Sequence, residues 1–206
     1  AERTFREFFN QSANRKIILH ITGPTPNDHR VYLKRLLQRF TLLTKSLPIS
    51  IADRIFLAFS VGRDDHPSLR NNNLHPLSIE DIYRMATVFL FPSKREGRGL
   101  PIIESCASGV PIICHRYTSV EVFDEVIGVG LPEEQQIRYI PFPEQDNDSM
   151  LINEIAHLLM FPEANRDHNQ HNRNAVRLRY SREALTKSFE SFFEYFCAPT
   201  KGYFEN

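Results

Sequence analysis

The segment from residue 96 to residue 104 combines two carboxylates with a pair of glycines. Glu96 and Glu104 frame Gly97 and Gly99, between a predicted strand and a predicted helix. Glycine makes up only 8 of the 206 residues, so a pair at this spacing is informative. A glycine loop presents bare backbone N–H groups, and the dipole of the following helix attracts an anion. The segment therefore predicts a phosphate-binding loop.

The two carboxylates add a second kind of chemistry to this loop. A carboxylate does not bind phosphate, but it accepts paired hydrogen bonds from vicinal hydroxyls, such as those of a sugar or a ribose. Glu96 at the tip of the loop and Glu104 about one turn into the helix together indicate a sugar nucleotide. The alternative is that Glu96 is a solvated loop charge and Glu104 is a helix carboxylate favoured by the dipole.

The elements that must position this loop alternate along the chain as short branched apolar runs and segments of helical period. We predict strands at 17–21, 54–60, 88–91, 112–115 and 137–140, and helices at 28–45, 78–84, 100–109, 119–124, 147–161, 163–177 and 182–196. This order is typical of α/β proteins with a Rossmann-like, doubly wound parallel sheet. Ligands of such sheets bind beyond the carboxyl ends of the strands, here in loops 23–28, 61–77, 92–99 and 115–119.

Composition excludes several classes of protein. Lys and Arg number 25, as do Asp and Glu, so the formal net charge is zero and we expect no nucleic-acid partner. No apolar run approaches the roughly 18 residues of a membrane-spanning helix. Cys106, Cys114 and Cys197 form an odd set without C-x-x-C spacing, which favours neither a disulfide framework nor a zinc site and fits a reducing cytoplasmic setting.

The run EGRGLPIIESCASGVPIIC is specific enough to suggest a family. It resembles the E-x7-E signature of retaining glycosyltransferases of family 4, which have the GT-B fold. More loosely, HITGPTPNDH resembles the first glycine loop of that family, and LSIEDIYRMATVFLFPS resembles the helix and strand that lead to the motif. The resemblance implies the C-terminal, donor-binding lobe of an enzyme that transfers a sugar, with retention, from a nucleoside-diphosphate sugar to an acceptor hydroxyl.

The resemblance also implies roles for individual residues. Glu96 would be the catalytic carboxylate, in contact with the hydroxyls of the donor sugar, and Glu104 would hold the ribose hydroxyls. The backbone of Leu77 would lie beside the nucleobase. The sugar and the diphosphate would meet a run of four residues: Gly97, Arg98, Gly99 and Leu100. Such enzymes need no cofactor and no metal ion, so none is expected here.

Two departures from the family pattern bear on activity. Arg98 stands where the family usually has an aromatic residue, and it could add a phosphate contact or change which sugar fits. The arginine and lysine that clamp the diphosphate in the family are absent from this sequence, so we expect the fragment alone to be inactive. The alternative function is a non-catalytic nucleotide-sugar-binding or regulatory module. A nucleotide-sugar epimerase could share the architecture, but the E-x7-E spacing argues against it.

We predict two parts: a nucleotide-sugar-binding domain over 1–180, truncated at its N-terminus, and a C-terminal helix and tail over 181–206. The helical pattern of Phe5, Phe8 and Phe9 begins without a cap, which indicates a chain cut within a helix. The expected partner is therefore a missing N-terminal acceptor-binding domain. Any membrane contact would involve that missing lobe.

Several other residues are of types that could bind a ligand or a metal, but each has a simpler structural explanation. They are the basic residues Lys94, Arg95 and Arg98, the D-x-D triplet Asp146-Asn147-Asp148, the trio Asp167, His168 and His171, the strand histidines His20 and His115, and the stripe Phe189, Phe192, Phe193 and Phe196. We interpret the basic residues as a solvated face and the D-x-D triplet as a helix cap. The trio is interpreted as part of an exposed polar helix, the strand histidines as structural, and the phenylalanine stripe as ordinary packing on the core.

Overall fold

In the computed structural model, the described residues are 8–10, 15–22, 30–59, 77–143 and 149–197. The chain divides into an N-terminal unit, Ala1–Ser78, and a C-terminal unit, Ile79–Asn206. The division predicted at residue 180 stays a prediction.

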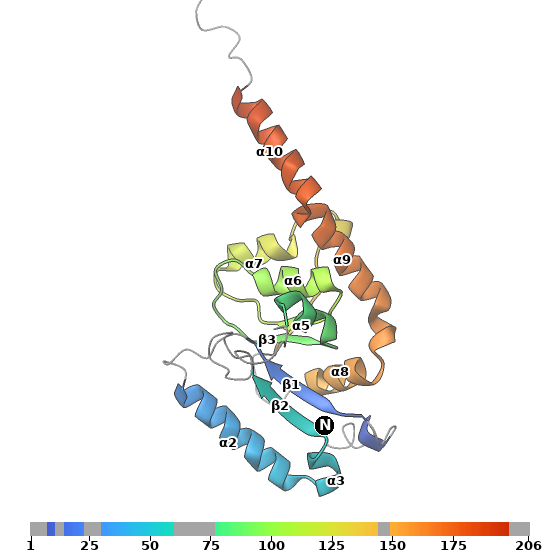
Figure 1. Ribbon diagram of the computed structural model, residues 1–206. Helices are drawn as coiled ribbons and strands as arrows, with labels where there is room; N and C mark the ends of the chain where they lie inside the picture. Colours follow the sequence, from blue (N-terminus) through green and yellow to red (C-terminus); the bar gives the residue numbers. More distant parts are fainter. Residues whose placement is uncertain (1–7, 11–14, 23–29, 60–76, 144–148, 198–206) are drawn as a thin grey trace, which may run out of the picture. The chain divides into compact units, whose positions relative to one another are not determined.

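The N-terminal unit contains a parallel pair of strands (Figure 1). Strands β1 (Ile17–Ile21) and β2 (Ile55–Phe59) are in register, with Ile17 opposite Ile55. Both strands are rich in branched and aromatic residues, which suit a pleated surface. Helices α2 (Arg30–Ser46) and α3 (Ile49–Ala52) lie between them in the chain, as a parallel crossover requires.

The C-terminal unit is built on a second parallel sheet, with the strand order β3-β4-β5. Strands β3 (Phe89–Phe91), β4 (Ile112–Cys114) and β5 (Ile140–Pro141) are short, and every residue of β4 is buried. A strand buried on both faces contains a continuous apolar run, as the sequence of β4 does. The predicted α/β class with parallel strands is confirmed.

In the described part of this unit, six helices precede, separate and follow the strands of the sheet. They are α5 (Ile79–Met85), α6 (Leu100–Ser108), α7 (Val120–Ile127), α8 (Ser149–Met160), α9 (Arg166–Tyr180) and α10 (Arg182–Cys197), with 3-10 turns η2 (Glu133–Gln135) and η3 (Pro162–Asn165). Glycines end two of them: Gly109 after α6 and Gly128 after α7 both have a left-handed backbone. The predicted helices therefore exist, with boundaries shifted by a few residues.

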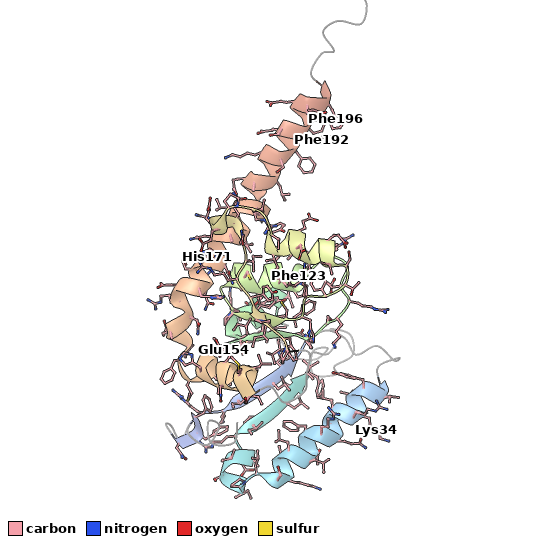
Figure 2. The ribbon with its side chains drawn as sticks, turned by 180° about the vertical axis from the view of Figure 1, so that it is seen from behind. Lys34, Phe123, Glu154, His171, Phe192 and Phe196 are labelled. Atoms are coloured by element: carbon pink, nitrogen blue, oxygen red, sulfur yellow. The ribbon has the colours of Figure 1, made fainter. Side chains whose placement is uncertain are left out.

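The core of this unit lies between the sheet, α6, α7 and α9. Ile102 of α6, Ile112 of β4 and Phe123 of α7 are fully or almost fully buried in it, and Figure 2 labels Phe123. Helix α9 fixes its neighbours through polar contacts with their backbone. The Arg173 guanidinium donates to the Ser108 carbonyl at 2.8 Å, and the Arg179 guanidinium donates to the Val126 carbonyl at 2.8 Å.

The last strand differs from its prediction. A strand was predicted at 137–140, but β5 contains only Ile140 and Pro141. The preceding backbone pairs elsewhere, because Ile137 N–H donates to the Ile127 carbonyl at 2.8 Å. The Asn172 side chain then satisfies both backbone groups of Arg138, at 2.8 and 2.7 Å. A side-chain amide thus replaces the neighbouring strand at this position.

The aromatic stripe of α10 also differs from the expected packing on the core. Phe189, Phe192, Phe193 and Phe196 are between 55% and 65% exposed. Figure 2 labels Phe192 and Phe196, whose rings contact each other with centroids 4.4 Å apart. Phe192 also contacts the Phe193 ring, with centroids 6.1 Å apart. Within the described residues, none of the four side chains belongs to the buried core.

Candidate functional site

The loop between β3 and α6 is fixed to the segment that follows β4. Thr118 N–H donates to the Lys94 carbonyl at 3.0 Å, and Glu96 N–H donates to the Thr118 carbonyl at 2.9 Å. Arg95 and Thr118 form a parallel bridge that extends the pairing of β3 with β4. The loop therefore lies at the carboxyl end of the sheet, where ligands of α/β proteins bind.

Gly99 makes the turn from this loop into α6. Its backbone is left-handed, with φ +64°, and it is the N-cap of the helix. A Cβ at Gly99 would lie 2.3 Å from the Tyr117 hydroxyl oxygen and 2.9 Å from Val126 Cγ2. Both the backbone conformation and the available space therefore require glycine. A Cβ at Gly97 would meet no atom of the described residues within 4 Å.

The N-terminus of α6 is open to a polar ligand. The Ile102 N–H donates to the Gly99 carbonyl at 3.0 Å, but the amides before it lie too early in the helix for an i−4 partner, and among the described residues no side-chain hydrogen bond caps the helix. Pro101 occupies the first turn, where its missing N–H costs nothing. Leu100 begins the helix and is 49% exposed. These groups give the predicted site an electropositive helix end.

Glu96 occupies part of the predicted anion position. Its Oε1 accepts hydrogen bonds from the amides of Gly97 at 2.8 Å and Arg98 at 3.1 Å. These two amides were predicted to meet the sugar and the diphosphate. In the structure the nearest carboxylate satisfies them, because two adjacent amide donors favour any anion within reach. A phosphate at the same amides must displace Glu96.

Glu104 is oriented by a tyrosine from α5. The Tyr83 hydroxyl donates to Glu104 Oε2 at 3.1 Å, and Tyr83 is only 4% exposed. Burial raises the pKa of Tyr83 above its usual value, and the charge of Glu104 raises it further, so the hydroxyl remains a donor. We did not predict Tyr83 as a site residue. The available signal was a tyrosine on a predicted helix, since buried tyrosines need a hydrogen-bond partner.

A second tyrosine outside the predictions, Tyr117, lies beneath the loop. Its side chain is fully buried, and in the part of the chain described here its hydroxyl has no hydrogen-bond partner. The ring contacts Phe123 edge-to-face with centroids 5.0 Å apart. The sequence carried no direct signal for it, because Tyr117 and Gly99 meet only after β4 and α6 have packed.

The structure brings together only part of the predicted site. Glu96, Gly97, Arg98, Gly99 and Leu100 are consecutive and Glu104 follows within α6, all in the C-terminal unit. Leu77 belongs to the N-terminal unit and is 57% exposed. The roles predicted for these residues stay predictions. Loops 23–28 and 61–76, which contain the predicted first glycine loop, lie outside the described residues.

Among the secondary candidates, His168 and His171 lie on α9 and are half-buried. His171 Nε2 lies 2.9 Å from the Gln136 carbonyl oxygen, and burial lowers the pKa of His168. Within the described ranges, no group of three or more His, Cys, Asp or Glu side chains could hold a metal ion. The Asp146-Asn147-Asp148 triplet falls outside those ranges.

The two buried cysteines have a structural role. Cys106 and Cys114 are free and fully buried, and burial raises the pKa of each thiol to about 12, so both are protonated packing residues. Among the helices that the structure describes, none combines the length and apolar character needed to cross a membrane.

Comparison with known proteins identifies a family likeness at this loop. Residues 72–172, just under half of the chain, match the family model of glycosyl transferases group 1. A stretch of 47 residues is 45% identical to O-antigen chain mannosyltransferase B of Escherichia coli, and it covers 23% of this chain and 12% of that protein.

Solved structures supply the fold. Sucrose-phosphate synthase from Thermosynechococcus elongatus aligns with a TM-score of 0.55 and 18% identity, over 96% of this chain and 49% of that one. The pneumococcal O-GlcNAc transferase GtfA, in complex with UDP and GlcNAc, aligns with a TM-score of 0.46 and 16% identity, over 95% of this chain and 32% of that one. The first likeness confirms the predicted Rossmann-like class, as in the C-terminal lobe of a GT-B fold. This chain spans about half the length of that synthase.

Proposed function

We propose that the chain is the nucleotide-sugar-binding lobe of a glycosyltransferase of group 1. The observation that carries this proposal is the loop at residues 96–99, which leads through a left-handed glycine into the uncapped N-terminus of α6. The family match spans the whole loop and helix. A helix end of this kind suits a diphosphate, and the two flanking carboxylates suit sugar hydroxyls.

In this proposal each residue has a separate task. The amides of the loop and of the first turn of α6, at Gly97, Arg98, Gly99 and Leu100, bind the diphosphate and the sugar. Glu104, held by the Tyr83 hydroxyl, accepts hydrogen bonds from the ribose hydroxyls. The backbone of Leu77 lies beside the base. Glu96 leaves the loop amides and binds hydroxyls of the donor sugar.

The proposed chemistry is sugar transfer to an acceptor hydroxyl with retention, as in family 4. The carbon–oxygen bond to the diphosphate breaks, and the acceptor oxygen bonds to the same carbon on the same face. The proton of the acceptor hydroxyl passes to the departing diphosphate oxygen. The loop amides and the α6 dipole stabilise the negative charge of the leaving diphosphate. We further propose that the reaction needs neither metal nor cofactor, that a separate lobe binds the acceptor, and that the site works in the cytoplasm.

The choice of sugar and pathway draws on one relative. The stretch of this chain that is 45% identical to an O-antigen chain mannosyltransferase supports transfer of a hexose in polysaccharide synthesis. Mannose is therefore the first sugar to test. The exposed Arg98 lies within the loop and is the side chain in a position to affect which sugar fits.

The test compares Glu96 variants of the full-length protein in a sugar-transfer assay. Glu96→Gln keeps an oxygen that can accept from the Gly97 and Arg98 amides but removes the charge, whereas Glu96→Ala removes both. We expect Glu96→Ala to lose about 10²-fold in kcat/KM, as removal of an electrostatic contact at a reacting group does. Glu134→Gln, an exposed carboxylate on η2, is the matched control and should retain wild-type activity.

Two results would change the proposal. Transfer by Glu96→Ala within about twofold of wild type, against the ~10²-fold expected loss, contradicts a catalytic role for Glu96. The alternative, a non-catalytic binding module, is supported if the wild-type protein binds a nucleotide sugar in calorimetry but transfers no sugar.

A further inference from the structure

The Tyr117 hydroxyl is a buried polar group that folding alone does not explain. Tyr117 is 0% exposed, and its hydroxyl has no hydrogen-bond partner among the described residues. Buried tyrosine hydroxyls usually find a partner, since an unpaired one reduces the stability of the folded state. A phenylalanine of the same shape would avoid this loss. The stability of the fold therefore does not account for the hydroxyl, and a role in ligand binding is the alternative.

The hydroxyl is aimed at the turn that begins α6. A Cβ at Gly99 would lie 2.3 Å from the Tyr117 oxygen, so the oxygen fills the space directly behind Gly99. Among the residues that the structure describes, no side-chain hydrogen bond caps the helix at this glycine. The N-terminus of α6 and the Tyr117 hydroxyl thus lie on either side of Gly99.

The ring of Tyr117 is fixed and cannot turn toward another partner. It packs edge-to-face on Phe91, with centroids 6.3 Å apart, and on Phe123, with centroids 5.0 Å apart. Phe123 in turn packs on Tyr139 at 5.2 Å. A partner for the hydroxyl must therefore come from the loop or from what binds there.

Binding of an anion at the loop amides requires the loop to rearrange. Glu96 Oε1 now holds the amides of Gly97 and Arg98, and a phosphate at these amides displaces it. Gly97 has no side chain and can therefore adopt a wide range of backbone conformations. In the described part of the chain, no atom lies within 4 Å of the position of a Cβ there.

We propose that Tyr117 is a positioning residue of the donor site, whose hydroxyl gains its hydrogen bond from the rearranged loop when a nucleoside-diphosphate sugar binds. This inference rests on the proposed function. Burial and the nearby charge of Glu96 raise the pKa of Tyr117 to about 12, so its hydroxyl keeps its proton at neutral pH and can donate. Tyr117 thus stabilises the bound arrangement at the expense of the free one.

The test measures affinity and stability on the same variant of the full-length protein. Calorimetric titration with UDP, GDP and ADP and their glucose and mannose derivatives identifies the ligand of the wild type, which is then titrated into Tyr117→Phe. We expect the affinity of Tyr117→Phe to fall about fivefold to tenfold, the effect of one lost hydrogen bond. Its melting temperature without ligand should rise by about 2 to 4 °C.

Tyr139→Phe is the matched control, because it removes a hydroxyl from the same row of rings. It should keep the wild-type affinity. If Tyr117→Phe binds the ligand as tightly as wild type, the inference is wrong while the proposed function stands. If the wild type binds none of the ligands, the proposed donor site is wrong and this inference falls with it.

Discussion

At the scale of the residue, the site depends on side chains that hold other side chains. Glu104 lies within α6, and its carboxylate receives a hydrogen bond from Tyr83, which is 21 positions away in the sequence. The Tyr83 ring itself packs against Phe89 with centroids 4.9 Å apart. The orientation of Glu104, the carboxylate proposed to bind the ribose, is therefore set by the contact of α5 with β3.

We predict that Tyr83→Phe weakens nucleotide binding without unfolding the protein. Loss of one hydrogen bond to a charged group should lower the affinity about threefold to tenfold, since Glu104 loses its fixed orientation. Calorimetric titration with the nucleotide bound by the wild type measures this. Tyr32→Phe, a tyrosine 69% exposed on α2, is the control and should have no effect. Equal affinities for Tyr83→Phe and wild type would mean that Glu104 needs no support.

At the scale of the element, most of the C-terminal unit was predictable because its elements follow local rules. The apolar run of β4 and the pair Pro101 and Gly109 at the two ends of α6 each reflect a local preference of the chain. The strand predicted at 137–140 is present only from Ile140, and the reason for this difference in bounds is not local. Ile137 and Arg138 pair with α7 and with Asn172, which only the packed fold brings near.

The same distinction holds for the candidate site. The loop glycines and both carboxylates could be found from spacing alone, since they are close in the sequence. The partners Tyr83 and Tyr117 could not, because nothing in the sequence indicates which buried tyrosine will face Glu104 or Gly99. Nor could the sequence show that Glu96 folds back on its own loop, since this depends on the loop's backbone geometry.

The start of α6 provides a matched pair of substitutions. Gly99→Ala places a Cβ against Tyr117 and Val126 in a left-handed conformation, so it should lower the free energy of unfolding by about 2 kcal/mol or more. The Cβ of Gly97→Ala meets no described atom within 4 Å, so this variant should change the free energy of unfolding by less than about 1 kcal/mol. Urea denaturation of both variants measures the difference. Similar losses for both would show that the space behind Gly99 does not matter.

At the scale of the whole molecule, the two units differ in how much they bury. Among the described residues, the buried hydrophobic side chains of the N-terminal unit are Phe8 and Phe9, whereas the C-terminal unit has a contiguous cluster around β4. The β1–β2 pair leaves Ile18 63% exposed. Local stability follows such burial, because opening a segment with few buried contacts costs little free energy.

We therefore predict that the two sheets differ in hydrogen exchange. The amides of Ile17–Ile21 and Ile55–Phe59 should exchange at least about tenfold faster than those of Ile112–Cys114. Exchange followed by mass spectrometry on the 206-residue chain measures this directly. Equal protection of the strands in both units would contradict the prediction.

In the proposed donor site, the carboxylate of Glu96 on its own loop would also exclude small ions. Because it is tethered beside the Gly97 and Arg98 amides, it competes for them at a high effective concentration. A free phosphate or chloride ion must replace it with nothing else to hold on to. A ligand that also reaches Glu104 has a second point of attachment to offset the exchange. The loop amides would then exclude the abundant small anions of a cell but bind the proposed nucleotide sugar, whose ribose also reaches Glu104.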